Sequence, residues 1–348
     1  MYKRQIVVIE PLEEQNRISE MRKSGLNIMM SMKSDAKPVS FVEDCAVPLP
    51  HLADYTQGLT DIFKKYGTHG TWYAHASVGC LHVRPVLNMK NGSDVTKMRA
   101  IALEAFELVK KFSGSHSGEH GDGISRSEFN PVMFGEKLNT AFIKLKKILD
   151  PSDLFNPGKI VNAPKMDARD LFRYAPGYKA SDFPTTLDWK EWPGAAGGLQ
   201  GAVEMCNNNG ACRKLVGGVM CPSFRITRDE KDSTRGRANI LRLAMSGQLG
   251  PDAMISDKMK ESLKLCVSCK ACKRECPTGV NVSSMKIEIN ALWAAKHSLS
   301  LHDWLIAYLP NYASVVTKVP WVMNLRDRIP GLPFISEKIT GFSSRRRL

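Results

Sequence analysis

The chain has 348 residues, of which 43% are hydrophobic and 24% charged, so an ordinary globular protein of two or three domains is expected. We find no apolar run of membrane-spanning length and no signal-peptide core, which makes a cytoplasmic protein the default. The net charge of +14 fits nucleic acid, an acidic membrane surface, an acidic protein partner, or a fragment whose acidic complement lies elsewhere.

The first part of the chain, residues 1–165, mixes strand and helix patterns. Strands are expected at 5–10 and 39–44, and residues 70–87 predict two strands around a turn. Helices are expected at 13–30, 50–67, 93–112 and 135–150, the third with Ser93 or Asp94 as N-cap. These patterns predict an α+β domain in which helices cover one face of an antiparallel sheet.

The rest of the chain changes character at about residue 166. Residues 166–200 are rich in Pro, Gly and aromatic side chains, and we interpret them as a linker. Residues 201–300 combine helical turns with cysteine-rich loops, and a helix is indicated over 284–307. Residues 301–348 form a helical tail of amphipathic pieces separated by prolines.

One cysteine run, "CVSCKACKRECP", extends from Cys266 to Pro277. Its spacing is that of bacterial ferredoxins, in which three thiolates hold one cubane iron–sulfur cluster and the fourth cysteine binds another cluster. Zinc is the alternative, but structural zinc sites usually use paired C-x2-C units with a longer spacer between them.

A second, degenerate run is "CNNNGACRKLVGGVMCP". Exchanging the fourth cysteines of the two runs predicts a [4Fe–4S] site made of Cys221, Cys266, Cys269 and Cys272. The remaining set is Cys206, Cys212 and Cys276. Three ligands predict a [3Fe–4S] cluster, or a [4Fe–4S] cluster completed by Asn209 or water. The alternative is that Cys206 and Cys212 are ordinary buried thiols.

Other residues near these motifs suit simpler roles. Cys45 and Cys80 are expected to be small core residues. The arginines that follow the degenerate run are expected to tune a cluster or to lie on a solvated face, rather than to form a nucleic-acid patch; they are Arg225, Arg228, Arg235 and Arg237.

A histidine pair lies in "HASVGCLH". A two-residue turn at Val78-Gly79 would place His75 directly opposite His82, with Cβ atoms roughly 5 Å apart. Two imidazoles so placed can share a metal ion, which Glu119 of "SGEHGDG" could complete while His120 serves as acid or base. The alternative is that both histidines are core or surface residues.

Several of these stretches resemble a known family. "HASVGCLHVRP", "SGEHGDG" and "ILDPSDLFNPGKIV" resemble the C-terminal half of FAD-linked oxidases of the vanillyl-alcohol oxidase type, especially the D-2-hydroxyacid dehydrogenases. "CNNNGACRK" and the "MCPSFRITRDEKDSTRGRAN" that follows resemble bacterial fusions of such an oxidase with an iron–sulfur module. The resemblance implies a ferredoxin-like antiparallel sheet, the oxidase cap domain, followed by an all-α iron–sulfur domain of the bis-cluster type.

The resemblance also implies roles for particular residues. His75, His82 and Glu119 match the ligands of a divalent metal of the zinc or manganese class. His120 matches the base that takes the substrate hydroxyl proton, and Arg22 an arginine that binds the substrate carboxylate. Asn156 and Lys159 match positions where the chain returns to the FAD.

Two departures from the family pattern matter. The family loop between the histidines is "GDGN", whereas this chain has "SVGC". The N-terminal FAD-binding domain of the family is missing, so we expect either the middle piece of a longer enzyme or one product of a split gene. An open, partly apolar face is then expected around His120 and Asn156.

We therefore expect an oxidoreductase that converts a D-2-hydroxyacid (2-hydroxyglutarate, lactate or glycolate) to the 2-oxoacid. Hydride would pass to FAD, and single electrons would pass through the clusters to an acceptor protein or a quinone. The alternatives are a non-catalytic electron-transfer subunit that needs a separate FAD-binding domain, and a zinc-containing nucleic-acid module. No nucleic-acid partner is expected, and the location would be cytoplasmic or peripheral at the inner face of the membrane.

Overall fold

The computed structural model of the chain describes residues 8–347. The strand expected at 5–10 begins outside the described residues, and residues 8–10 lie in no strand. Across the described part of the chain, no helix is both long and apolar enough to cross a lipid bilayer.

A small antiparallel sheet organises the first part of the chain. The long strand β4 (Cys80–Leu87) pairs with β3 (Gly70–His75) along one side. Along its other side β4 pairs with two short strands, β1 (Lys37–Pro38) and β2 (Cys45–Ala46). The segment between β1 and β2 is irregular, so the strand expected at 39–44 is wrong.

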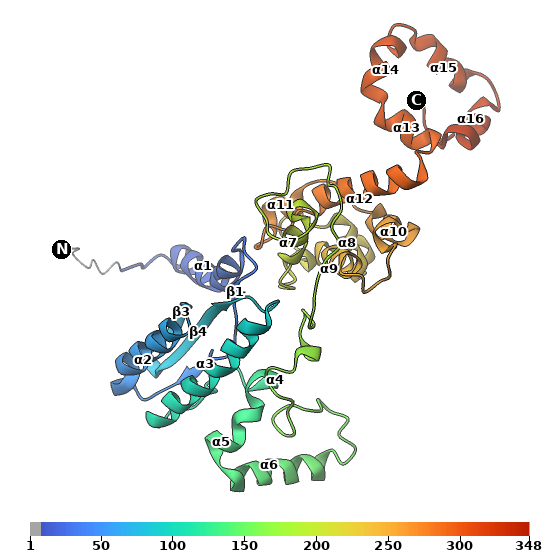
Figure 1. Cartoon of the computed structure of the whole chain (residues 1–348). Coiled ribbons are helices and arrows are strands. Elements are labelled where there is room, and N and C mark those ends of the chain that lie inside the picture. The colour runs from blue at the N-terminus through green and yellow to red at the C-terminus, as the bar shows by residue number, and fades with distance from the viewer. Residues whose placement is uncertain (1–7, 348) are drawn as a thin grey trace.

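Two long helices, α2 (Leu52–Lys65) and α3 (Gly92–Lys111), pack together and cover one face of this sheet (Figure 1). Their apolar positions recur at helical spacing and form a buried core with β4 and the irregular segment. The expected N-caps of α3 are wrong: Asn91 precedes the helix, and Asp94 accepts the amide N–H of Asn88. The predicted α+β class, with helices on one face of an antiparallel sheet, is confirmed.

Three helices follow: α4 (Gly123–Arg126), α5 (Asn130–Phe134) and α6 (Glu136–Leu149). No residue of α6 is buried, and Figure 1 shows this helix standing away from the sheet. Its amphipathic pattern therefore leaves an apolar side exposed, as Leu145, Ile148 and Leu149 illustrate.

The stretch expected as a linker, 166–200, holds only two single 3₁₀ turns before α7, yet it is packed. The fully buried carboxylate of Glu288 accepts the backbone N–H groups of Thr186 and Leu187 and the indole N–H of Trp189. A carboxylate with three donors is well satisfied, so this segment is anchored to the helical part of the chain.

The helical part has a core of its own, which extends from Trp189 to Ile289 and includes four of the cysteines. Its helices are α7 (Leu199–Glu204), α8 (Pro222–Thr227), α9 (Thr234–Met245), α10 (Asp257–Lys264), α11 (Ala271–Glu275) and α12 (Val282–His297).

A ring of four short helices extends from the end of α12 (Figure 1). They are α13 (Leu301–Ala307), α14 (Leu309–Val316), α15 (Pro320–Arg328) and α16 (Leu332–Thr340). The helix expected over 284–307 is thus two helices, because the chain turns at Ser298, whose φ is 55°.

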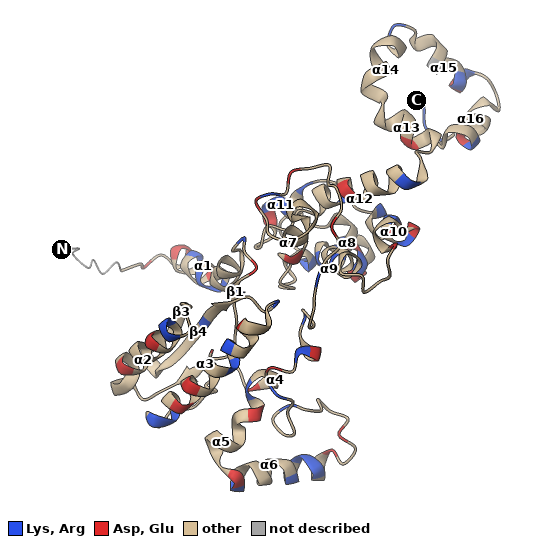
Figure 2. Cartoon of the chain, viewed as in Figure 1, with Lys and Arg blue, Asp and Glu red and all other residues tan. Residues whose placement is uncertain are grey.

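Charged residues of both signs are distributed over all these parts, with Lys or Arg near Asp or Glu on α2 and α3 (Figure 2). The excess of 49 basic over 35 acidic residues is therefore spread along the chain and is not confined to one element.

Candidate functional site

The β3–β4 hairpin brings the two histidines together, although not in the expected register. Tyr73 lies opposite His82, and His75 lies opposite Cys80, because the turn contains four residues rather than two. The register differs from the prediction by two residues, and side chains alternate with a period of two, so both histidines stay on one face. They are diagonal neighbours, with ring centroids 5.1 Å apart.

Glu119 contacts both histidines from the loop between α3 and α4. Its Oε1 atom lies 3.0 Å from Nε2 of His75 and 2.9 Å from Nε2 of His82. His120 stacks on the ring of His82 at a centroid distance of 4.6 Å. The residues singled out on the hairpin and in the "SGEHGDG" loop therefore meet in one place.

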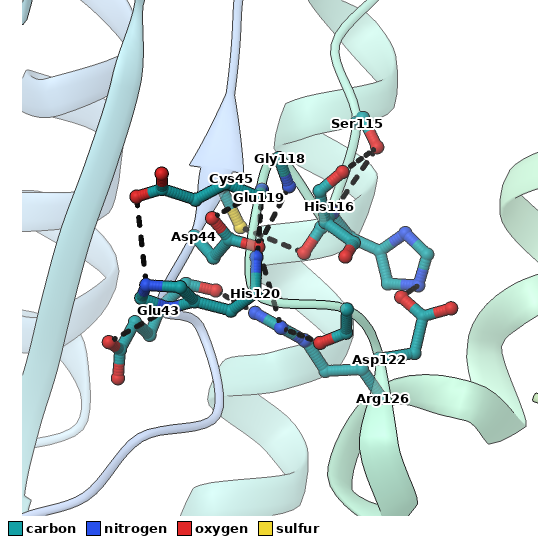
Figure 3. Close-up of polar contacts among 12 residues, drawn as sticks. Glu43, Asp44, Cys45, Ser115, His116, Gly118, Glu119, His120, Asp122 and Arg126 are labelled. Carbon is teal, nitrogen blue, oxygen red and sulfur yellow. Dashed lines mark hydrogen bonds and ion pairs between the residues drawn. The ribbon is translucent and has the colours of Figure 1, made fainter. Parts of the chain in front are cut away.

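Asp44 fixes this loop, as Figure 3 shows. Its carboxylate accepts the backbone N–H groups of Gly118, Glu119 and His120 at 2.8–3.0 Å. Asp44 is fully buried and has a φ of 74°. Burial alone would raise the pKa of Asp44, but the three amide donors and nearby Arg126 hold it below its usual value.

A second carboxylate, that of Glu43, lies behind the histidine rings. It forms a buried ion pair with Arg84, whose Nε lies 2.8 Å from Oε2. Its Oε1 lies 3.4 Å from Nδ1 of His120 and 3.8 Å from Nδ1 of His82. Burial opposes ionisation, yet the hydrogen bonds from Arg84 and Ser40 lower the pKa of Glu43.

His82 has the environment of a neutral imidazole. Burial, the strongest influence, and nearby His120 lower its pKa, and the attraction of Glu43 and Glu119 only partly opposes them. A neutral ring with a free nitrogen can bind a metal ion, and Nε2 of His82 faces Glu119, whereas its Nδ1 is buried without a hydrogen-bond partner among the described residues.

The donor atoms fit a divalent cation. One group with ligand atoms within 4.8 Å of one another contains Asp44, Cys80, His82 and Glu119, and another contains Glu43, His82 and His120. His75 belongs to neither group, but its Nε2 atom lies 3.0 Å from the Glu119 oxygen. Nitrogen and carboxylate donors of this kind suit zinc or manganese.

An open pocket of about 530 Å³ lies in front of these groups. It is lined by His75, His82, Glu119 and His120, and by Arg22 of α1 (Leu12–Met30). Arg22 donates to the hydroxyl of Tyr73 at 2.8 Å. The pocket thus combines a cationic side chain with the histidine–carboxylate group.

Asn156 and Lys159 do not line this pocket. They lie in the exposed loop after α6, where Nζ of Lys159 is 3.4 Å from Oδ1 of Asn156. The structure therefore separates the two residues expected at the flavin from the histidine group.

The sequence patterns do not indicate Glu43 and Asp44 as site residues, because residues 39–44 predict only a strand. The available signal was the pair of adjacent acids in an otherwise apolar stretch, where buried charges are rare unless they are paired.

The cysteine runs form the second part of the site. One cavity is lined by the four predicted ligands of the [4Fe–4S] site, which are Cys221, Cys266, Cys269 and Cys272. Burial raises the pKa of Cys221 to about 11, although Thr234 donates hydrogen bonds to its sulfur. A buried thiol of this kind gives up its proton readily only to a metal.

The three remaining cysteines also lie close together. Cys206 follows α7, Cys212 lies in a 3₁₀ turn, and Cys276 follows α11. Burial raises the pKa of Cys206, and the nearby sulfurs of Cys276 and Cys212 add to this effect. Cys206 thus lies near both Cys212 and Cys276, as a cluster shared by the three would require.

The amide of Asn209 is already engaged. Its oxygen accepts the N–H of Ala211, and its nitrogen donates to Asn207. Asn208 instead faces Cys206, with its Oδ1 atom 3.7 Å from the sulfur. That oxygen also accepts an amide N–H of Asn239 at 2.8 Å, so both asparagine side chains are already hydrogen-bonded.

The four arginines divide into two groups. The N–H of Arg235 is 3.4 Å from the sulfur of Cys212, and Arg237 is buried beside Cys221 in the cluster cavity. Arg228 is exposed, whereas Arg225 is half-buried and donates to the backbone carbonyl of Gly217. Cys45 is buried in the core of the first part, whereas buried Cys80 lies 3.6 Å from Asp44 beside the histidines.

Two family models match different parts of this chain. Residues 3–160 match the model for the C-terminal domain of FAD linked oxidases, and residues 202–280 match the model for the 4Fe-4S dicluster domain. The D-2-hydroxyglutarate dehydrogenase of Escherichia coli is 30% identical to this chain over 93% of this chain's length. The corresponding protein of Pantoea ananatis is also 30% identical, over 90% of this chain.

Another relative matches a smaller share of the chain. The D-lactate dehydrogenase of Archaeoglobus fulgidus is 29% identical over 36% of this chain and 27% of its own length. The chain covers 35% of the Escherichia coli protein and 34% of the Pantoea protein, so it spans about a third of the length of these relatives.

Proposed function

The chain joins a C-terminal domain of the FAD-linked oxidases to a 4Fe–4S dicluster domain, and on this premise we propose that it oxidises a D-2-hydroxyacid to the 2-oxoacid. The substrate would be of the 2-hydroxyglutarate, lactate or glycolate class. The observation that carries the proposal is the contact of one Glu119 oxygen with both His75 and His82, beside His120 and Arg22.

Each group in the pocket then has a separate task. His75, His82 and Glu119 would hold a divalent metal, which when bound supplies a Lewis acid for the hydroxyl and carboxylate oxygens of the substrate. The guanidinium of Arg22 binds a carboxylate of the substrate. Loop residues 118–120, held by Asp44, keep these groups in a fixed arrangement.

His120 is the proposed base for the hydroxyl proton. Its Nδ1 atom lies 3.4 Å from Glu43, and its Nε2 atom lies 3.6 Å from the Glu119 oxygen proposed to hold the metal, so Nε2 is the nitrogen that would face a substrate bound there. Loss of this proton assists departure of hydride from the carbon, and FAD when bound accepts that hydride. Asn156 and Lys159 remain proposed contacts of FAD. A separate FAD-binding domain or subunit would have to bring the FAD to the pocket.

The cysteines would hold two clusters. Cys221, Cys266, Cys269 and Cys272 are the proposed ligands of a [4Fe–4S] cluster. Cys206, Cys212 and Cys276 would bind a [3Fe–4S] cluster, or a [4Fe–4S] cluster with a non-cysteine ligand. Substitution of Cys269 by Ala should remove iron and sulfide from the first site, whereas Cys45→Ala should leave the iron content unchanged.

The electrons would leave to an acceptor protein or a quinone. The corresponding location is cytoplasmic or peripheral at the inner face of the membrane. A second candidate is an electron-transfer subunit without its own turnover, because the chain spans only about a third of its relatives.

The experiment is turnover of anaerobically reconstituted protein with FAD, zinc or manganese, D-2-hydroxyglutarate or D-lactate, and an electron-accepting dye. Little turnover is expected from the chain alone, and turnover should appear when an FAD-binding domain is supplied separately. Glu119→Gln should then abolish the metal-dependent rate, whereas Glu107→Gln, an exposed change on α3, should not. Absence of substrate-dependent dye or cluster reduction in the complete system would favour the electron-transfer subunit.

A further inference from the structure

A second pocket lies beside the core of the first part of the chain, and residues 172–174 form part of its wall. It measures about 300 Å³, at the lower end for small-molecule sites, and it shares no lining residue with the histidine pocket. Its walls are apolar and include Phe41, Met98, Met166 and Phe172. Aromatic rings and thioethers pack well against a flat apolar ligand.

One cationic group, the guanidinium of Arg173, lines this pocket. Its Nε and Nη2 atoms are buried and have no hydrogen-bond partner among residues 8–347, and no carboxylate there is ion-paired with it. Buried donors without a partner are costly, so the arrangement suits a ligand that presents an acceptor oxygen.

The same guanidinium reaches the cysteine cluster region. Its Nη1 atom donates to the backbone carbonyl of Cys206 at 2.8 Å. Cys206 is the first of the three cysteines at the proposed second cluster. A molecule bound in the pocket would therefore be separated from this cysteine by a single arginine side chain.

We propose that this pocket binds the ring of a quinone, which is the external electron acceptor. A quinone has flat apolar faces for the Phe and Met side chains and a carbonyl oxygen for Arg173. This proposal rests on the proposed function. The overall reaction balances, because the D-2-hydroxyacid loses two electrons and two protons, and the quinone gains two electrons and two protons to become the hydroquinone. Negative charge that develops on the oxygen during reduction is stabilised by the guanidinium.

The test is calorimetric titration of the oxidised, cluster-loaded chain with 2-methyl-1,4-naphthoquinone, in the absence of hydroxyacid. The matched ligand is 2-methylnaphthalene, which has the same ring without acceptor oxygens. The quinone should bind at least tenfold more tightly than the hydrocarbon, and Arg173→Met should remove most of this preference. Equal affinity for both ligands overturns the proposal.

A second variant keeps Arg173 intact. Ser125 is half-buried at the pocket, and Ser125→Phe should fill it and weaken quinone binding at least tenfold. Ser152→Phe, an exposed change near α6, should bind quinone as the unchanged chain does. The proposal is overturned if the Ser125→Phe variant binds the quinone as tightly as the unchanged chain does. It is also overturned if decanoate displaces the quinone at a concentration lower than that of the quinone.

The binding measurement separates this proposal from the proposed function. If the protein oxidises the hydroxyacid with a dye but does not bind the quinone, the quinone site is overturned and the proposed function stands. Specific quinone binding without hydroxyacid turnover supports the site and contradicts the proposed function.

Discussion

At the residue scale, Asp44 shows how one side chain can position a whole loop. A single carboxylate satisfies three consecutive amide N–H groups, and the residues so held include Glu119 and His120. Arg126 closes the arrangement through the carbonyl oxygens of Glu43 and Gly121 (Figure 3). A loop rich in glycine would otherwise sample many conformations.

Asp44→Asn should therefore destabilise the protein by about 2–3 kcal/mol at pH 7, because an amide offers one acceptor oxygen in place of two charged ones. The folded pKa of Asp44 is depressed, so its contribution is complete above the ordinary aspartate pKa, roughly 3.9, and is lost as pH falls through the lower folded value. Denaturant unfolding at several pH values checks this. Exposed Asp170→Asn should change little at any pH, and an equal loss for both variants would contradict this role.

At the element scale, the β3–β4 hairpin depends on its turn. Gly79 has a φ of 72°, and a Cβ atom there would lie 1.9 Å from the carbonyl oxygen of Val47. The turn thus packs directly on the chain beyond β2, which fixes how the His75 and His82 side chains face the Glu119 loop.

Gly79→Ala should lower the free energy of unfolding by at least about 3 kcal/mol, because the cost of backbone strain and the cost of a steric clash add together. Gly67→Ala is the matched control: its φ is 66°, but a Cβ atom there meets nothing within 4 Å, so only the strain of about 1 kcal/mol is expected. Thermal unfolding and zinc titration of both variants measure the difference. Equal losses would show that the contact with Val47 is unimportant.

At the scale of the whole molecule, buried charges join the two cores. Lys90, between β4 and α3, pairs with Asp35 at 2.5 Å and with Glu204 of α7 at 2.6 Å. Glu204 also accepts the hydroxyl of Tyr178 at 2.6 Å. Since Cys206 lies only two residues beyond Glu204, this contact fixes the cysteine region against the sheet.

Lys90→Met should destabilise the protein by about 3–5 kcal/mol, because Glu204 keeps a buried charge without its partner. The two cores should then unfold separately, with two calorimetric transitions instead of one, and trypsin should cut faster within 166–200. Lys97→Met, which removes a half-exposed pair with Asp94, should leave one transition. A single unshifted transition for Lys90→Met would contradict this role.

The ring of α13–α16 has a different relation to the rest. No residue of α13, α14 or α16 is buried, and many large apolar side chains are exposed, among them Trp304, Trp321 and Phe334. One of its contacts with the main body is a half-exposed pair between Lys260 and Asp303, which is worth about 0–1 kcal/mol.

A chain ending at Ser298 should therefore keep nearly the same melting temperature and iron content. Ending the chain at Asn281 instead removes buried Met285, Glu288 and Ile289 of α12, and should unfold the helical core. Differential scanning calorimetry and iron analysis of both truncations provide the comparison. Unfolding of the Ser298 form would show that the ring stabilises the cluster domain.

The sequence by itself determined features that depend on local spacing. The cysteine intervals predicted which thiols line one cavity, and the period of two kept His75 and His82 on one face although the turn was longer than predicted. Helix positions followed from apolar periodicity, and most ends fell within a few residues of those observed.

Only the tertiary structure decided the contacts between distant segments. Asp44 meets residues more than 70 positions away, and Lys90 meets Glu204 across the two cores. The sequence also did not predict that Asn156 and Lys159 lie away from the histidines. Local spacing fixes which side of an element a residue occupies, but the partner on that side depends on how separate elements pack, because buried charges must find their counter-groups wherever the fold brings them.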